Sequence, residues 1–140
     1  MGFENEIAGK LADHLRSFEQ VRFALLFGSR AWNNGHAHSD IDLAVFVDPR
    51  LSARERFELR LSLAAMVADL GEPDVVILND APALLRHRAL RGKLLFCRDK
   101  REYVGFFVRS VDEWLDQRYW AELFHCKRKE RLKEGRFGRP

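Results

Sequence analysis

Two short apolar runs separated by a polar stretch constrain this chain more than any other feature. Residues 21–27 are almost continuously apolar and lead directly into Gly28 and Ser29. A second apolar run, residues 43–47, follows an Asp-x-Asp triplet. Runs of this length and composition are typical of buried β-strands. The pattern therefore predicts two strands joined by a polar loop, with Gly-Ser where the loop begins and two aspartates where it ends.

The two aspartates of the triplet have the spacing of a metal site. Side chains two residues apart on a strand point to the same face, so Asp40 and Asp42 present both carboxylates on one side of the predicted sheet. Mg2+ is bound through one or two carboxylates together with the phosphates of a substrate. At the other end of the loop, Gly28 lets a phosphate approach the backbone closely, and Ser29 can cap a helix N-terminus that attracts anions. The arrangement predicts nucleotidyl transfer.

A third acidic residue stands at the head of a later apolar run. Asp74 begins the sequence Asp-Val-Val-Ile-Leu, in a segment that we predict to be a strand over residues 72–78. The simple explanation is solvation of a strand end. The functional explanation is a third carboxylate beside Asp42 that ligates the catalytic metal or accepts the proton of an attacking hydroxyl. We favour the functional explanation.

The spacing of these motifs resembles that of a known family. Gly-Ser, ten residues and then Asp-x-Asp is similar to the signature of the DNA polymerase beta-like nucleotidyltransferases, and the small single-domain members, the minimal nucleotidyltransferases, look most like this chain. The strand that carries Asp74 resembles their third-carboxylate strand. Family members commonly carry a small residue and Arg-Gly shortly after Gly-Ser, whereas residues 32–35 here are Trp-Asn-Asn-Gly. This departure concerns recognition of the triphosphate or base, not the metal site.

The resemblance implies an activity and a partner. It implies ATP as substrate, with its phosphates at Gly28 and Ser29, and two Mg2+ ions held by Asp40, Asp42 and Asp74 as catalytic and metal-binding residues. Arg30 is a weaker candidate for phosphate binding, because an exposed loop cation explains it equally well. Minimal nucleotidyltransferases are often antitoxins encoded beside a HEPN toxin, which they silence by transferring AMP to a toxin tyrosine. A HEPN-type toxin is therefore the expected partner.

Two other functions stay open. The chain could transfer a nucleotide to a small hydroxylated molecule, or it could be an antitoxin that acts by binding alone. Three acidic residues in this pattern argue against the binding-only function, because a non-catalytic binder has no need of them. Two histidines of the loop, His36 and His38, invite a different metal hypothesis, but Mg2+ prefers oxygen ligands over imidazole.

Composition fits a single domain. The chain has 140 residues, 46% of them hydrophobic and 32% charged, with a net charge of +3. These values are typical of globular proteins, and the small positive charge is compatible with a polyanionic substrate without identifying one. Two widely spaced cysteines indicate neither a disulfide framework nor a zinc site. The acidic N-terminus and the lack of a long apolar run predict a cytoplasmic protein with no membrane partner.

We expect an α/β (α+β) fold with about four strands in a small mixed sheet flanked by helices, as in the polymerase beta-like core. Helices are predicted over residues 4–18, from a capping box at Ser52 and Glu55 up to Gly71, from Pro82 onward, and over 100–134; a short fourth strand is predicted near residues 94–96. We divide the chain into a nucleotidyltransferase core (1–98), a C-terminal helix that completes the domain or forms a partner interface (99–134) and a basic tail (135–140).

Two helices are expected to carry broad apolar faces. In the helix after Ser52 the predicted apolar stripe comprises Phe57, Leu61, Ala64, Ala65, Val67, Ala68 and Leu70. The long C-terminal helix is expected to bury Val104, Phe107, Val108, Val111, Trp114 and Leu115, and its further apolar residues (Phe106, Tyr119, Trp120, Leu123, Phe124) exceed what a single core needs. That excess leaves open a protein interface or a helix wrapping its own domain. Residues 127–140 hold seven basic residues against two acidic ones, for which solvated charge is favoured over contact with RNA.

Overall fold

The computed structural model describes residues 3–28 and 40–133, with side chains described from residue 6 to 28 and 41 to 128. The elements, in chain order, are α1 (Phe3–Arg16), β1 (Val21–Phe27), β2 (Asp40–Val47), α2 (Ala53–Val67), β3 (Glu72–Ile77), the 3-10 turn η2 (Leu78–Asp80), α3 (Ala83–Leu90), β4 (Lys93–Cys97) and α4 (Lys100–Lys133). The described part of the chain contains no helix with the length and apolar character needed to cross a membrane.

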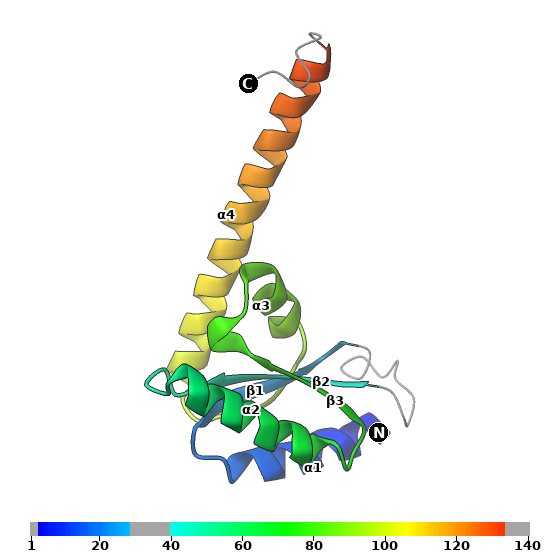
Figure 1. Cartoon of the computed structure of the whole chain (residues 1–140), viewed down its shortest axis with the longest axis vertical. Helices are drawn as coiled ribbons and strands as arrows, with labels where there is room; N and C mark the ends of the chain where they lie inside the picture. Colours follow the sequence, from blue (N-terminus) through cyan, green and yellow to red (C-terminus); the bar gives the residue numbers. More distant parts are fainter. Residues whose placement is uncertain (1–2, 29–39, 134–140) are drawn as a thin grey trace.

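The four strands form one mixed sheet in the order β3-β2-β1-β4. β1 pairs antiparallel with β2 and with β4, whereas β2 and β3 are parallel. The parallel pair needs a crossover connection, and α2 supplies it. A small mixed sheet flanked by helices, followed by a long terminal helix, is the predicted fold class, and the structure confirms it (Figure 1).

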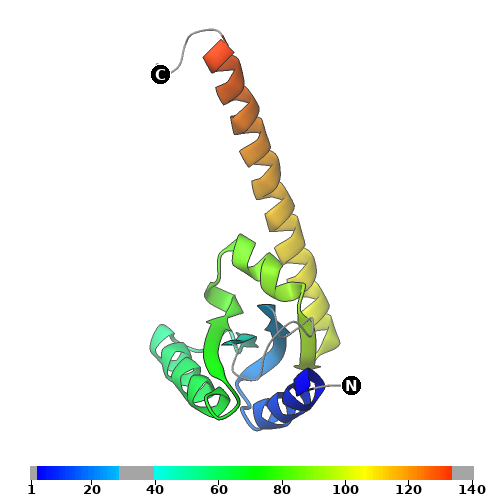
Figure 2. The same ribbon diagram turned by 90° about the vertical axis from the view of Figure 1, so that its right-hand side faces the viewer.

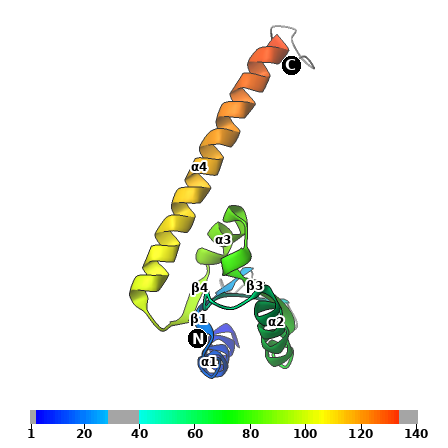
Figure 3. The same ribbon diagram turned by 60° about the vertical axis from the view of Figure 1, so that its left-hand side comes forward.

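The sheet is covered on both faces, which explains why β1 reads as a continuous apolar run. One face packs against α1 and α2 through a cluster that includes Leu11, Leu43 and Leu63, all fully buried. The opposite face packs against α3 and the start of α4, and its cluster includes Phe23 and Phe46, whose rings stack 5.0 Å apart. Figures 2 and 3 show α1 and α2 together on one side of the sheet and α3 on the other.

The helix after Ser52 begins as predicted but buries a different face. The Ser52 hydroxyl accepts a hydrogen bond from the Glu55 amide while the Glu55 carboxylate accepts one from the Ser52 amide, so the capping box is confirmed. The residues of α2 that the core buries are Leu59, Leu63 and Val67. The predicted stripe is therefore wrong at Phe57 and Leu61, which are 58% and 55% exposed, and at Ala65 and Ala68, which are also exposed.

The end of α2 also differs from the prediction. The helix stops at Val67 with Ala68 as its C-cap, so Gly71 does not close it. Two turn hydrogen bonds, from the amides of Leu70 and Gly71 to the Val67 carbonyl, carry the chain from the helix into β3 instead. These bonds satisfy the Val67 carbonyl without a glycine in the left-handed conformation.

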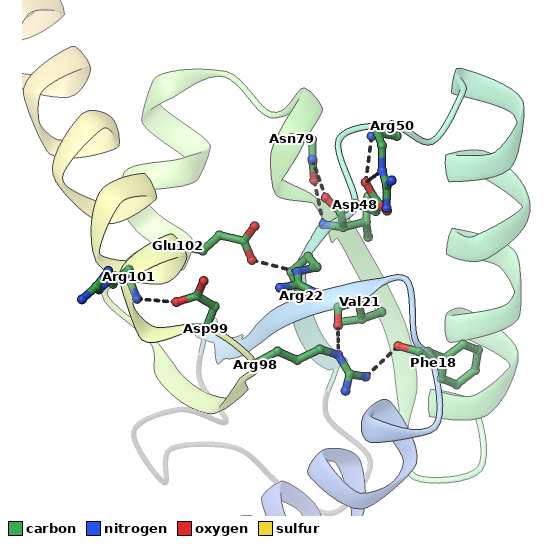
Figure 4. Close-up of polar contacts among 11 residues, drawn as sticks. Phe18, Val21, Arg22, Asp48, Arg50, Asn79, Arg98, Asp99, Arg101 and Glu102 are labelled. Carbon is green, nitrogen blue, oxygen red and sulfur yellow. Dashed lines mark hydrogen bonds and ion pairs between the residues drawn. The ribbon is translucent and has the colours of Figure 1, made fainter.

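Side-chain hydrogen bonds join the ends of the elements (Figure 4). The Arg98 guanidinium donates to the carbonyls of Arg16, Phe18 and Val21 and so holds the end of β4 against the turn between α1 and β1. The side-chain amide of Asn79 donates to the Val47 carbonyl and accepts from the Val47 amide. It thereby continues the β2–β3 ladder for one step past the end of β3.

The first half of α4 packs on the body and the second half projects from it (Figures 1 and 2). Phe106 and Ser110 are buried, and Trp114 stacks on His87 of α3 with 3.9 Å between ring centroids. The predicted buried face is therefore wrong at Val104, Phe107, Val108 and Leu115, which are exposed, whereas Phe106, expected beyond the core, belongs to it. Burial lowers the pKa of His87, which favours the neutral ring in this stack.

Candidate active site

All four strands meet the predicted site at one end of the sheet. β1 runs toward that end and finishes at Phe27, directly before Gly28. β2 is antiparallel to β1 and β3 is parallel to β2, so both strands begin there. Each has an acidic residue at its first and third positions: Asp40 and Asp42 in β2, Glu72 and Asp74 in β3. β4, antiparallel to β1, begins there as well, at Lys93. The sheet order thus gathers segments that are up to 65 residues apart, from residue 28 to residue 93, at one place.

Asp42 and Asp74 are direct neighbours in the sheet. They are register partners on the parallel strands β2 and β3, and neighbouring strands lie about 4.8 Å apart. Alternation places both on the face that carries Phe46 and Val76, which is the face covered by α3. Asp42 is half-buried and Asp74 is exposed. The structure therefore brings together two of the three predicted carboxylates, from segments 32 positions apart, at an accessible place.

Gly28 lies against the carboxylate of Asp42. Its backbone has φ 75°, in the left-handed region that glycine adopts without strain. A Cβ atom added at this position would lie 2.1 Å from Oδ2 of Asp42 and 3.1 Å from its Cγ. A side chain at this position would displace the Asp42 carboxylate, so the Gly-Ser motif begins in contact with Asp42.

The remaining predicted residues lie wholly or partly outside the described residues. Asp40 is described through its backbone, which pairs with Glu72 across the β2–β3 ladder, but not through its side chain. Ser29 and Arg30 are outside the description, as are Trp32, His36 and His38. The catalytic and binding roles of Asp40, Ser29 and Arg30 stay predictions, as do those of Gly28, Asp42 and Asp74, for which the structure gives positions only.

The donor set at this end of the sheet fits Mg2+ in its chemistry. Asp42 and Asp74 offer carboxylate oxygens, which a hard divalent cation prefers, and the predicted third ligand, Asp40, would add two more. Among the side chains from residue 6 to 28 and 41 to 128, no three acidic, histidine or cysteine residues group closely enough to form a metal site by themselves. A metal held here would therefore need Asp40 or oxygens from a substrate's phosphates.

Three residues at this end of the sheet had no role in the sequence analysis. Glu72 precedes Asp74 by two residues, so the strand period places it on the same face, and its acidic character was the available signal. Lys93 starts β4 opposite Leu26. Gly92 packs so tightly against β1 that an added Cβ would lie 2.4 Å from the Leu26 carbonyl oxygen. Nothing in a lone glycine between a helix and a strand indicates this contact.

Solved structures share this architecture. A toxin–antitoxin crystallised with AMP-PNP is 26% identical, with 90% of this chain and 98% of that one covered at a TM-score of 0.66. The MntA–HepT toxin–antitoxin is 22% identical (88% and 97% covered, TM-score 0.63). A tri-AMPylated Shewanella oneidensis HEPN toxin in complex with MNT antitoxin is 21% identical (89% and 98% covered, TM-score 0.65). The latter two likenesses show the fold. No curated protein matches the chain.

The family itself is shown by a match over most of the chain. The family model described as polymerase beta, nucleotidyltransferase matches residues 9–101. This range contains the whole sheet, the Gly28 contact with Asp42 and the register pair of Asp42 with Asp74. The protein is therefore a nucleotidyltransferase of the polymerase beta family.

Proposed function

We propose that this nucleotidyltransferase is the antitoxin of a HEPN-type toxin and transfers AMP from ATP to a tyrosine hydroxyl of that toxin. The observation that carries the proposal is the register pairing of Asp42 with Asp74 next to Gly28, inside the part of the chain that matches the family. Support for the partner and the nucleotide comes from the similar structures, one a toxin–antitoxin with AMP-PNP and another a HEPN toxin carrying AMP groups.

Each residue has a defined task in the proposed reaction. Gly28 and Ser29 bind the triphosphate through the backbone and the serine hydroxyl, and Asp40 and Asp42 are the first two acidic residues of the site. The acceptor oxygen attacks the α-phosphorus, the bond from that phosphorus to the bridging oxygen breaks, and pyrophosphate leaves. The hydroxyl proton passes to the Asp74 carboxylate, whose exposure leaves room for an acceptor. Mg2+, held by Asp40, Asp42 and Asp74, would supply neutralisation of the phosphate charge.

The long helix favours a macromolecular acceptor over a small molecule. An isolated helix of this kind is marginally stable in water, yet the projecting half of α4 exposes Tyr119, Trp120 and Phe124 by 62%, 54% and 60%. Exposed aromatic clusters of this type mark protein interfaces. The described chain also lacks a second domain with which to enclose a small acceptor, whereas a protein acceptor brings its own surface.

Intact-mass spectrometry of a co-purified partner tests the proposal. The protein is isolated with the partner from cells that carry both genes, and the complex is incubated with ATP and Mg2+. We expect the partner to gain one or more AMP groups, and fragmentation to place them on tyrosine. A complex that forms without any mass change would indicate an antitoxin that acts by binding. A modified metabolite with an unmodified partner would indicate a small-molecule acceptor. Either result would contradict the proposal.

A further inference from the structure

A groove runs along the open side of β3. β3 is the last strand of the described sheet and pairs with β2 on one side only. α2 forms one wall of the groove, η2 and the start of α3 form the other, and the strand lies between them. The resulting cavity has a volume of about 610 Å3. Its lining residues are Leu51, Ala53, Arg56, Phe57, Arg60, Val75, Val76, Ile77, Asp80, Ala81, Pro82 and Leu85.

The floor of this groove has the chemistry of a strand-addition site. A strand paired on one side presents the backbone N–H and C=O groups of its other side, and a further extended segment can pair with them. Pro73, which has no N–H to donate, is tolerated in such an edge strand and limits the pairing at that end. The groups around Val75 and Ile77 remain for an added strand, and both residues line the cavity.

The walls define which extended segment would fit. Phe57 offers an exposed ring on the α2 side. Arg56 is mostly buried and already donates to the Asp80 carboxylate and the Pro49 carbonyl. Arg60 lines the same wall, and no ion pair is found for it within the described residues. Arg60 is therefore the cation that can bind a partner here, and the groove favours a segment with apolar side chains and a carboxylate or carbonyl oxygen for Arg60.

The lining of the groove begins at Val75, one residue after Asp74 of the candidate active site. Asp74 precedes Ile77 by three residues on the same strand, which corresponds to about 10 Å at 3.3 Å per residue. In a strand added to β3, the side chain beside Asp74 would stand on the same face, with about 5 Å between Cβ atoms. Asp42, Asp74 and that residue would then form a row across three strands, and a hydroxyl there would lie beside the predicted proton acceptor.

We infer that the groove along β3 binds an extended segment of the protein acceptor by strand addition, and that the modified hydroxyl belongs to the residue of this segment beside Asp74. The inference rests on the proposed function, because it concerns how that acceptor is presented. The occupant is a peptide segment with apolar side chains and an acidic or carbonyl group for Arg60. The modified residue lies within a few positions, along the same segment, of the residues that contact Phe57.

Photo-crosslinking maps the occupant without relying on catalysis. Benzoylphenylalanine is introduced in place of Phe57, in the complete protein with its co-purified partner, and the crosslinked peptide is identified by mass spectrometry. The control places the same residue at Leu61, which is equally exposed on α2 but does not line the cavity. We expect position 57 to crosslink to one segment that contains the modified residue, and position 61 not to do so. Absence of a partner crosslink at 57, or the same crosslinks at both positions, would overturn the inference.

Kinetics separate failure of this inference from failure of the proposed function. Phe57→Ser and Arg60→Glu are expected to raise the KM for the partner at least about tenfold, which corresponds to roughly 1.4 kcal/mol, and to leave ATP binding unchanged. Leu61→Ser should change neither value. If the wild type modifies the partner and both groove variants do so with unchanged KM, the inference is wrong and the proposed function stands. If the wild type modifies no partner, the proposed function fails. A partner crosslink at position 57 that is missing at position 61 would then still show that the groove binds a peptide.

Discussion

Replacing Gly28 with alanine tests the contact between Gly28 and the carboxylate of Asp42. The new Cβ would lie 2.1 Å from Oδ2 of Asp42, where ordinary contacts begin near 3.4 Å, so the carboxylate would have to retreat by about 1 Å. A misplacement of that size can cost on the order of 100-fold in rate. Alanine at φ 75° also costs roughly 1–2 kcal/mol in backbone conformation, which a domain of ordinary stability survives.

We therefore expect Gly28→Ala to remain folded and to transfer AMP at least about 100-fold more slowly than the wild type. The rate is measured with radiolabelled ATP and the co-purified partner, and folding by urea denaturation followed by circular dichroism. Gly9→Ala is the matched control, because an added Cβ there meets nothing within 4 Å. It lies inside α1, so it should stabilise the protein by about 0.5–1 kcal/mol and leave transfer unchanged. Wild-type transfer by Gly28→Ala would refute this reasoning.

Three further predictions concern stability. Gly92→Ala should destabilise the protein by about 1–3 kcal/mol in urea denaturation, because its Cβ would press on the backbone of β1; an unchanged midpoint would show that the turn relaxes freely. Arg98→Ala should lower the free energy of unfolding by about 1–3 kcal/mol, because three carbonyls lose their donor. A decrease no larger than that caused by replacing an exposed arginine would count against this prediction. The hydrogen bonds from Arg50 lower the pKa of Asp48 from 3.8 to about 2. Ionised Asp48 therefore stabilises the fold above pH 4, and this stabilisation is lost as the pH falls toward 2. Asp48→Asn should flatten the pH dependence of the unfolding free energy between pH 4 and pH 2.

The sheet could be predicted from the sequence because its signals are local. The apolar runs of β1 and β2 and the capping box at Ser52 each report on a few adjacent residues, and the structure has all of them. The faces of the helices were harder to predict. α2 holds apolar residues around most of its surface, so periodicity alone could not show that Leu59 and Leu63 face the core while Phe57 does not.

The candidate site shows the same division between local and distant information. The positions of Asp42 and Asp74 on strand-like segments were readable, but their register depends on how α2 returns the chain to β3, and no sequence pattern specifies it. The positive φ of Gly28 and the close packing of Gly92 against the Leu26 carbonyl arise from contacts between segments far apart in the chain. The groove beside β3 was not foreseen, because it requires knowing which strand ends the sheet.

The most direct test of the central claim measures AMP transfer to the co-purified partner by Asp42→Asn and Asp74→Asn, with Glu72→Gln as the control from the same end of the sheet. The proposed site predicts that both aspartate variants keep the wild-type unfolding midpoint in urea but add no detectable AMP, whereas Glu72→Gln remains active. A folded Asp42→Asn or Asp74→Asn variant that transfers AMP at the wild-type rate would contradict it.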